Sequence, residues 1–294
     1  MNKTTSMWQI PGTGGILVPG RWFWPRAVTW TALLFALSIE AFFACYQLPD
    51  SFRILKPLRM LIALTLPVAT LVVYALAVRF VERRSVTELA LSRAPMELIL
   101  GFVAGFVFIT GTLLLLWAAG LYDVQRGTWR HVWGYFVYNS YISAVLEELA
   151  FRAILLRLFA RMFGPLPALI LSSAAFGLAH ASHAPLAAVL EICLNSGMVL
   201  GLLYLVSGRL WLAVGAHLSI DFTEWSLMGV GDHDGLLQAT PVPGHSAWLT
   251  GGNFGPDGSL LSSLVGVVLI VAILALKRMS NKRSKPADRL VSAR

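Results

Sequence analysis

The sequence predicts an all-α fold, a polytopic transmembrane helical bundle, and three observations support this prediction. Hydrophobic residues make up 57% of the 294 residues, charged residues make up only 13%, and the mean hydropathy is +0.70. Soluble globular domains carry about 25% charged residues. These values exclude a disordered chain, a disulfide scaffold and an ordinary soluble enzyme. The chain is therefore expected to reside in a lipid bilayer.

About eight apolar stretches have the length of a membrane helix, since a bilayer core of about 30 Å is crossed by roughly 20 helical residues. The fifth and sixth stretches are separated only by a short break near Pro185. The seventh stretch is short and partly polar, so seven or nine helices are alternatives. The eight expected spans cover residues 28–47, 60–78, 98–119, 132–156, 166–183, 186–206, 210–227 and 260–276.

The distribution of Lys and Arg predicts that both termini are cytoplasmic. With the N-terminus inside, the inside segments carry 17 basic residues and the outside segments carry 5, which is the usual bias of cytoplasmic loops. Residues 1–27 are then a cytoplasmic segment and residues 28–276 a single transmembrane domain with an extracytoplasmic loop at 228–259. Residues 277–294 form a basic cytoplasmic tail. We expect this multi-pass protein in the cell inner (plasma) membrane.

The net charge of +8 is interpreted as a membrane feature. The basic residues lie between apolar runs, where they serve as topology signals and contact anionic lipid headgroups. No patch combines aromatic with basic residues, so no nucleic-acid partner is expected. Cys45 and Cys193 lie inside apolar runs without the spacing of a metal or redox motif, and we expect them to be packing residues.

Ionisable residues in the fourth expected span are the first candidates for function, because each costs on the order of several kcal/mol at mid-bilayer. Glu148 and Arg152 lie four residues apart on one helix face and can pair. Such a pair could simply lock helix packing. Glu147 lies about 100° around the helix and is left without a partner by that pairing. A free carboxylate in a membrane cavity is a candidate general base.

Two histidines extend this set. His180 lies one turn after Phe176 with small residues between them, although a lone histidine in an apolar helix is more often a hydrogen-bonded core residue than a catalyst. His217, Asp221 and Glu224 form a polar stripe on one face of the seventh span. This helix is therefore expected to line a wet cavity.

The spacing of these residues leaves their chemistry open. Two histidines with carboxylates would suit zinc or iron, but the HExxH spacing is absent and each histidine lies on a different helix. A metal site, a proton relay and a water-activating site all remain compatible with the pattern.

Three short motifs lie in order on three expected membrane helices. They are EExxxR beginning at Glu147, FxxxH beginning at Phe176 and HxxxD beginning at His217. With the flanking residues EELAFRAILL and FGLAHA, they resemble the CAAX protease and bacteriocin-processing family, also called CPBP or Abi, which includes the Ras-converting CAAX endopeptidase. The resemblance covers about 132–227, the expected catalytic core. Residues 1–130 resemble only generic membrane helices.

The resemblance implies a glutamate-dependent intramembrane endopeptidase that acts on a membrane-associated protein or peptide, with no metal or other cofactor. Glu147 would be the general base and would activate the attacking water with His180. Glu148 and Arg152 would orient and tune Glu147. His217 and the residue four positions later would stabilise the oxyanion.

Asp221 departs from the family's eukaryotic enzymes, which have Asn at this position. An ionised Asp cannot donate a hydrogen bond to an oxyanion, so we expect Asp221 to orient His217 instead. Two other classes of function remain alternatives. One is a non-proteolytic membrane scaffold or regulator, and the other is a proton-coupled transporter, which the absence of paired broken helices and of an inverted repeat disfavours. The catalytic interpretation requires Glu147, His180 and His217 to meet at one water-sized space.

Overall fold

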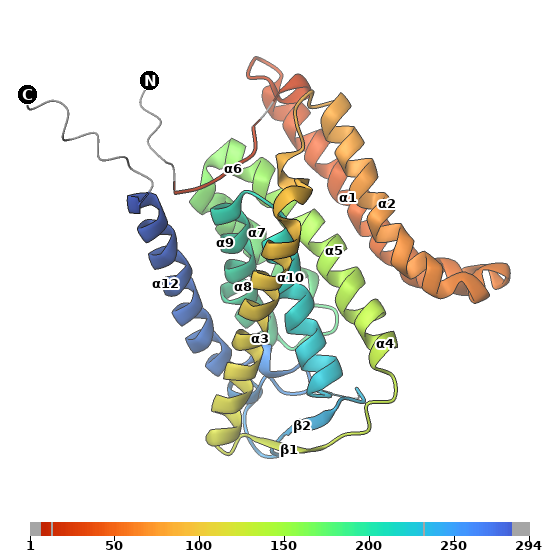
Figure 1. The fold of residues 1–294 in the computed structure, drawn as a ribbon, viewed down its shortest axis with the longest axis vertical. Helices are drawn as coiled ribbons and strands as arrows, with labels where there is room; N and C mark the ends of the chain where they lie inside the picture. Colours follow the sequence, from red (N-terminus) through yellow and green to blue (C-terminus); the bar gives the residue numbers. More distant parts are fainter. Residues whose placement is uncertain (1–6, 13, 232, 284–294) are drawn as a thin grey trace, which may run out of the picture.

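A computed structural model describes residues 7–12, 14–231 and 233–283. Long helices run side by side in a bundle, and both ends of the described chain lie at the same end of it (Figure 1). The outermost parts of the predicted cytoplasmic segment and basic tail, residues 1–6 and 284–294, lie outside the described residues.

Four long helices form the periphery of the bundle. Helices α1 and α2 make an antiparallel hairpin that leans away from the other helices at the end far from the termini (Figure 1). The 3₁₀ turn η2, Arg53–Leu58, connects them, and the short turns η3, Thr87–Leu89, and η4, Leu91–Arg93, lead into α3. The peripheral helices are α1 Phe23–Ser51, α2 Arg59–Phe80, α3 Ala94–Ala118 and α12 Leu260–Arg283.

One continuous helical stretch, residues 132–163, contains the fourth expected span. It alternates between α- and π-helical geometry, and a π-helical segment places one extra residue in a turn. Its parts are α4 Val132–Tyr135, η5 Phe136–Tyr141 (π), α5 Ile142–Glu148, η6 Leu149–Leu156 (π) and α6 Arg157–Phe163.

The inner helices follow this stretch in the chain. The predicted break near Pro185 is present, because α7 ends before it and α8 begins after it. The inner helices are α7 Pro165–Ala179, α8 Leu186–Leu194, α9 Ser196–Ser207 and α10 Trp211–Asp221, which continues as the π-helical η7 Phe222–Leu227.

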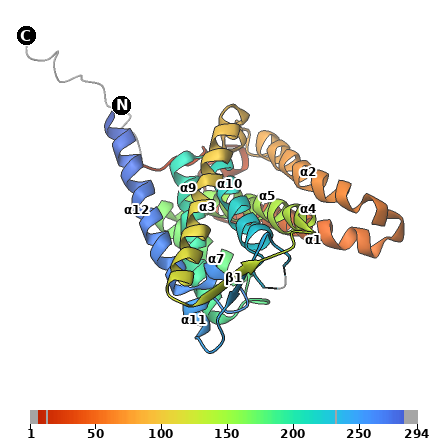
Figure 2. The ribbon, with the colours of Figure 1, turned by 60° about the horizontal axis from the view of Figure 1, so that its bottom comes forward.

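A small antiparallel sheet is the part of the fold that the sequence did not predict. Strand β1, Tyr122–Arg126, pairs with β2, Leu237–Pro241, in the register Val124 opposite Ala239. Both strands lie at the end of the bundle opposite the termini, together with the short helix α11, Ala247–Thr250 (Figure 2). Each strand has only five residues and a partner more than 100 residues away, so no local pattern indicates the pairing. The expected loop 228–259 is therefore a partly structured cap.

Apart from this small sheet, the structure confirms the predicted all-α membrane bundle. Five described stretches are long and apolar enough to cross a membrane: Phe23–Ser51, Ile54–Phe80, Thr87–Ala118, Leu186–Ser207 and Leu260–Lys282. The remaining three expected spans are helical as well, but they are shorter or carry the ionisable residues. Eight spans and a cytoplasmic N-terminus therefore stay predictions.

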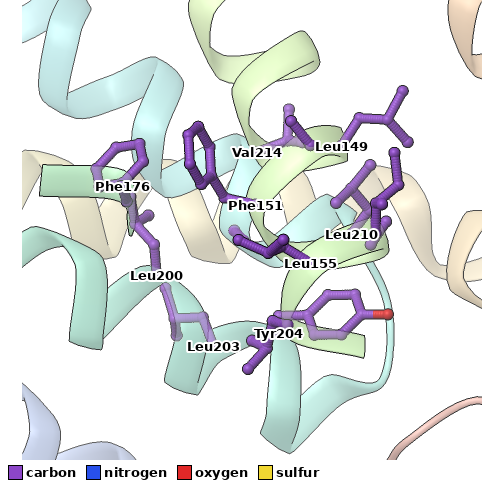
Figure 3. Packing of buried hydrophobic residues seen from close by; sticks show 14 of the residues in the cluster. Leu149, Phe151, Leu155, Phe176, Leu200, Leu203, Tyr204, Leu210 and Val214 are labelled. Carbon is purple, nitrogen blue, oxygen red and sulfur yellow. The ribbon is translucent and has the colours of Figure 1, made fainter. Parts of the chain in front are cut away.

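The buried core lies between η6 and the inner helices. Side chains from the long helical stretch interdigitate with those of α7, α9 and α10 (Figure 3). Because lipid tails are as apolar as leucine, such packing stabilises a membrane bundle through close contact more than through exclusion of water. The labelled core residues are Leu149, Phe151, Leu155, Phe176, Leu200, Leu203, Tyr204, Leu210 and Val214.

Helices α3 and α10 approach each other at backbone distance. A Cβ atom added at Gly101 would lie 2.2 Å from the carbonyl oxygen of Leu212, and one at Gly105 would lie 2.2 Å from that of Ala216. These two glycines form a GxxxG motif, which permits this approach in membranes. The contact fixes α10, the helix that carries His217, against the periphery.

A buried group of charged residues, here called the anchor cluster, joins the α2–α3 connection to α6. It consists of Glu82, Arg84, Glu88 and Arg157. Arg157 donates two hydrogen bonds of 2.7 and 2.8 Å to Glu82, and Arg84 bonds both glutamates. Burial opposes ionisation of Glu82, but the Arg157 guanidinium holds the pKa of this carboxyl below its usual value. Every charge in the cluster has an opposite partner, so the cluster fastens the α1–α2 hairpin to the bundle.

Candidate active site

One cavity brings together four of the six predicted site residues. It has a volume of about 780 Å³ and lies between α1, the long helical stretch, α7, α10 and the cap. Glu147, His180, His217 and Asp221 all line it. The three residues that the catalytic interpretation needs, Glu147, His180 and His217, therefore share one cavity, and their meeting at a single water-sized space stays a prediction. Glu148 and Arg152 do not line the cavity and are completely buried behind its wall.

Glu148 forms the expected pair with Arg152 and has a second partner. Its Oε1 atom accepts a 2.9 Å hydrogen bond from Nη1 of Arg152. The same oxygen lies 2.8 Å from Nδ1 of His217. A carboxylate only accepts hydrogen bonds, so Nδ1 of His217 carries a proton in this contact. The sequence suggested that Glu148 acts on Glu147, whereas its direct contact is with His217.

Asp221 lies on the other side of the same imidazole. Its Oδ2 atom is 3.5 Å from Nε2 of His217, one helical turn earlier in α10. This distance is at the limit of a hydrogen bond, so the interaction is weaker than the bond to Glu148. His217 is thus held between two carboxylates, and its Nε2 edge is the one that faces Asp221 and the cavity.

Phe176 packs at the centre of the site. The guanidinium carbon of Arg152 lies 4.2 Å from the centroid of its ring, a cation–π contact. The rings of His180 and His217 meet it edge-on, with centroids 5.0 and 5.7 Å away. The FxxxH motif contained this residue, but its side chain was not predicted to belong to the site. It fixes the relative positions of the two histidines and the arginine.

His180 caps the C-terminus of α7 and does not lie inside a longer helix as expected. The helix ends at Ala179, and the side chain turns back so that Nδ1 lies 2.9 Å from the carbonyl oxygen of Phe176. Because a carbonyl oxygen only accepts hydrogen bonds, Nδ1 carries a proton in this contact. The Nε2 atom is then free to accept a hydrogen bond in the cavity.

Glu147 is half-buried on the cavity wall. Its carboxylate makes no hydrogen bond or ion pair with another of the residues that the structure describes. This agrees with the prediction that pairing of Glu148 with Arg152 leaves its neighbour free. A carboxylate that is close to a cavity and unpaired can accept a proton from a bound water.

The helices that carry the site depart from α-helical geometry next to the candidate residues. The π-helical η6 begins directly after Glu148, and η7 begins directly after Asp221. Such segments are rare and recur at functional sites because they change which side chains face inward. Glu147 and Glu148 themselves lie in the α-helical α5, where a rotation of about 100° per residue places one on the cavity wall and the other in the interior.

Residues 129–223 match the model of a family described as type II CAAX prenyl endopeptidase Rce1-like. Over this segment, about a third of its length, the chain is similar to the CAAX protease family. All six predicted site residues lie within the match, from Glu147 to Asp221. Neither a curated protein nor a solved structure matched the chain.

The cap completes the cavity with residues beyond the segment that matches the CAAX protease family. His233 stacks on Trp225 at 5.5 Å and lies 2.9 Å from the Asn139 side-chain nitrogen, which closes the wall between η5 and η7. Asn253, Phe254 and Asp257 contribute from further along. These residues were missed because no sequence pattern indicates that the cap turns back over the helices.

Asp234 fastens the cap to the residues that precede α4. Its carboxylate accepts hydrogen bonds from the Thr128 hydroxyl and, at 2.9 Å, from the Arg130 amide. The Thr128 hydroxyl, together with backbone amides, lowers the pKa of this exposed carboxyl.

Metal binding was one of the options that the spacing of the site residues left open. Among the residues that the structure describes, no three His, Cys, Asp or Glu side chains are arranged so that they could hold a metal ion. The absence of a cofactor stays a prediction.

Proposed function

We propose that the chain is an intramembrane endopeptidase that hydrolyses a peptide bond of a membrane-associated protein or peptide with a water activated by Glu147. The observation that carries this proposal is the convergence of Glu147, His180 and His217 on one cavity. The matched family supports a CAAX-type membrane protease. The cavity lies within an apolar bundle, so substrates reach it from the lipid bilayer or its surface.

Glu147 serves as the general base in this mechanism. It takes a proton from the attacking water while the oxygen of the water bonds to the substrate carbonyl carbon. The same proton passes to the amide nitrogen as the carbon–nitrogen bond breaks, so the carboxylate is restored. His180 accepts a second hydrogen bond of the water at Nε2, because its Nδ1 is committed to the helix end. Base catalysis of this type contributes about 10²–10⁴-fold.

His217 stabilises the oxyanion. Glu148 holds the protonated Nδ1, and with a second proton on Nε2, beside Asp221, the imidazolium donates from Nε2 toward the cavity. Arg152 in turn holds Glu148, and both are positioning residues because neither lines the cavity. Asp221 orients the Nε2 edge from 3.5 Å. A pre-oriented donor of this kind contributes about 2.7–4 kcal/mol to transition-state stabilisation.

A structural scaffold would explain only part of this arrangement. Complete burial and mutual hydrogen bonding of Glu148 and Arg152 fit a structural pair. A free carboxylate on the cavity wall has no structural purpose, because an unpaired charge near an apolar interior costs stability. Glu147 therefore favours catalysis over a scaffold.

The test is cleavage by purified protein reconstituted in liposomes with a membrane-protein extract, read as new peptide termini by mass spectrometry. Wild type should generate a reproducible set of termini that Glu147→Gln does not generate. Glu40→Gln is the matched control, since Glu40 is an exposed glutamate on α1 outside the cavity lining. The same termini from Glu147→Gln would contradict the proposal.

A further inference from the structure

The cavity wall carries negative groups without matching positive ones. Four carboxylates line it, those of Glu147, Asp221, Glu224 and Asp257. No Lys or Arg is among the described residues that line it, and the only basic side chains are histidines. Residues 228–259, which form the cap, contain neither Lys nor Arg. Among the described residues, the cavity wall therefore has no permanently charged cationic side chain, and only His217 lies between two carboxylates.

Glu224 and Asp257 are the two carboxylates that the proposed hydrolysis does not use. They are 3% and 8% exposed, and in each an oxygen, Oε1 of Glu224 and Oδ1 of Asp257, is buried without a hydrogen-bond partner. The hydroxyl of Ser196, 4% exposed and on the same cavity wall, also lacks a partner. Buried polar groups in native proteins are normally satisfied, so these oxygens can accept hydrogen bonds from a group that enters the cavity.

The cap is shaped to hold Glu224 in this position. Gly255 lies so close that a Cβ atom there would be 2.1 Å from Oε1 of Glu224, and its φ of +136° is open only to glycine. Burial raises the pKa of Asp257 to about 7, as expected of a carboxyl without a cation beside it.

An organic cation fits these groups better than a metal ion does. The described residues contain no arrangement of three side chains that could hold a metal. The cavity is large enough for a side chain, and the ring of Trp225 forms part of its wall. An indole face attracts ammonium and guanidinium groups.

We propose that Glu224 and Asp257, with Trp225, form a subsite for the side chain of a lysine or arginine in the peptide substrate. This inference rests on the proposed peptidase function and adds a preference for basic substrates. Glu224 follows His217 by seven residues, which is about 10 Å along a helix. An extended peptide spans about 3.5 Å per residue. The basic residue therefore lies within about three residues of the scissile bond.

The test compares two apolar peptides that differ at one position, where one has lysine and the other the uncharged norleucine, two residues from the central bond. Binding is measured by calorimetry to detergent-purified Glu147→Gln protein, so the assay does not require cleavage. The lysine peptide should bind about ten-fold more tightly. When Glu224→Gln and Asp257→Asn are added to the Glu147→Gln protein, the preference for the lysine peptide should vanish, while the affinity for the norleucine peptide stays the same.

Asp123→Asn is the matched control, because it removes an exposed carboxylate of β1 far from the cavity lining. It should keep the preference for lysine. Both isosteric substitutions at Glu224 and Asp257 remove unpaired buried charge, so the variant should fold, and its unfolding temperature confirms this.

Equal affinity of the two peptides, no binding of either at millimolar concentration, or a preference that survives the double substitution would overturn the subsite. Cleavage of membrane peptides without a lysine preference would retain the proposed function and reject this inference alone. A preference for the lysine peptide in a protein that cleaves no membrane peptide would retain the subsite and reject the proposed peptidase function.

Discussion

Two buried groups of charged residues occur on or beside the same long helical stretch, and they differ in how their charges are matched. In the anchor cluster, Glu82 and Glu88 face Arg84 and Arg157, and every charged group has a partner. On the cavity wall, no Lys or Arg balances the carboxylates among the described residues. Burial is costly in both places. A matched cluster indicates structure, whereas an unmatched one that faces a cavity indicates function.

Arg157→Met should give the largest effect on stability. It leaves Glu82 buried without its main partner, and breaking a buried pair costs about 3–5 kcal/mol. Chemical unfolding of the purified protein measures this loss. The companion variant Glu82→Leu with Arg157→Met should recover part of it. Wild-type stability of Arg157→Met alone would show that matched charges do not distinguish a structural role of the anchor cluster from the role of the cavity-wall carboxylates.

His217→Ala should reduce cleavage by about 10²–10³-fold, because it removes the oriented donor from the oxyanion. The reduction should appear in kcat, with little change in KM, since the donor acts mainly in the transition state. Steady-state cleavage of a peptide identified from the membrane extract measures both parameters. A rise in KM alone would assign His217 to substrate binding.

Gly105→Ala should lower stability by about 1–3 kcal/mol, because the added methyl collides with the backbone of α10. It should also lower the cleavage rate by displacing His217. Gly111→Ala on the same helix is the control, since its Cβ would meet only a Val265 side-chain atom at 3.7 Å. Equal effects of the two substitutions would reject the close contact of α3 with α10.

Asp257→Asn should flatten the dependence of stability on pH, which is the smallest effect. The pKa of Asp257 is raised by burial to about 7, so its neutral form stabilises the fold. This contribution is present below about pH 4 and is lost as the pH rises toward 7 and above. Unfolding temperatures between pH 4 and 8 should therefore fall more for wild type than for the variant. If the unfolding temperatures of wild type and variant changed with pH in parallel, the raised pKa of Asp257 would be contradicted.

The sequence predicted what depends on local spacing. Apolar length gave the helices, and the four-residue separation gave the pair of Glu148 with Arg152. The motifs on three helices contain the four predicted site residues that line one cavity, although Glu148 and Arg152 of the same motifs lie behind its wall. The contact of Glu148 with His217 joins residues 69 positions apart, and no spacing rule indicates it.

The contacts that were not predicted depend on tertiary structure or on a sequence motif that was present but not used. The GxxxG motif at Gly101 and Gly105 could have indicated a close helix contact, although not its partner. Asp257 reaches the cavity only because the cap folds back over the helices. Arg157 meets Glu82 from 75 residues away. Such contacts become visible only once the helices are placed.

The unfolding temperature of Glu147→Gln, determined on the preparation that is assayed for cleavage, tests the central claim most directly. An unmatched carboxylate contributes no stabilising pair, so the variant should unfold at the wild-type temperature or above it while cleavage is lost. A decrease comparable with that of Arg157→Met would contradict the account, because Glu147 would then be a structural residue like those of the anchor cluster.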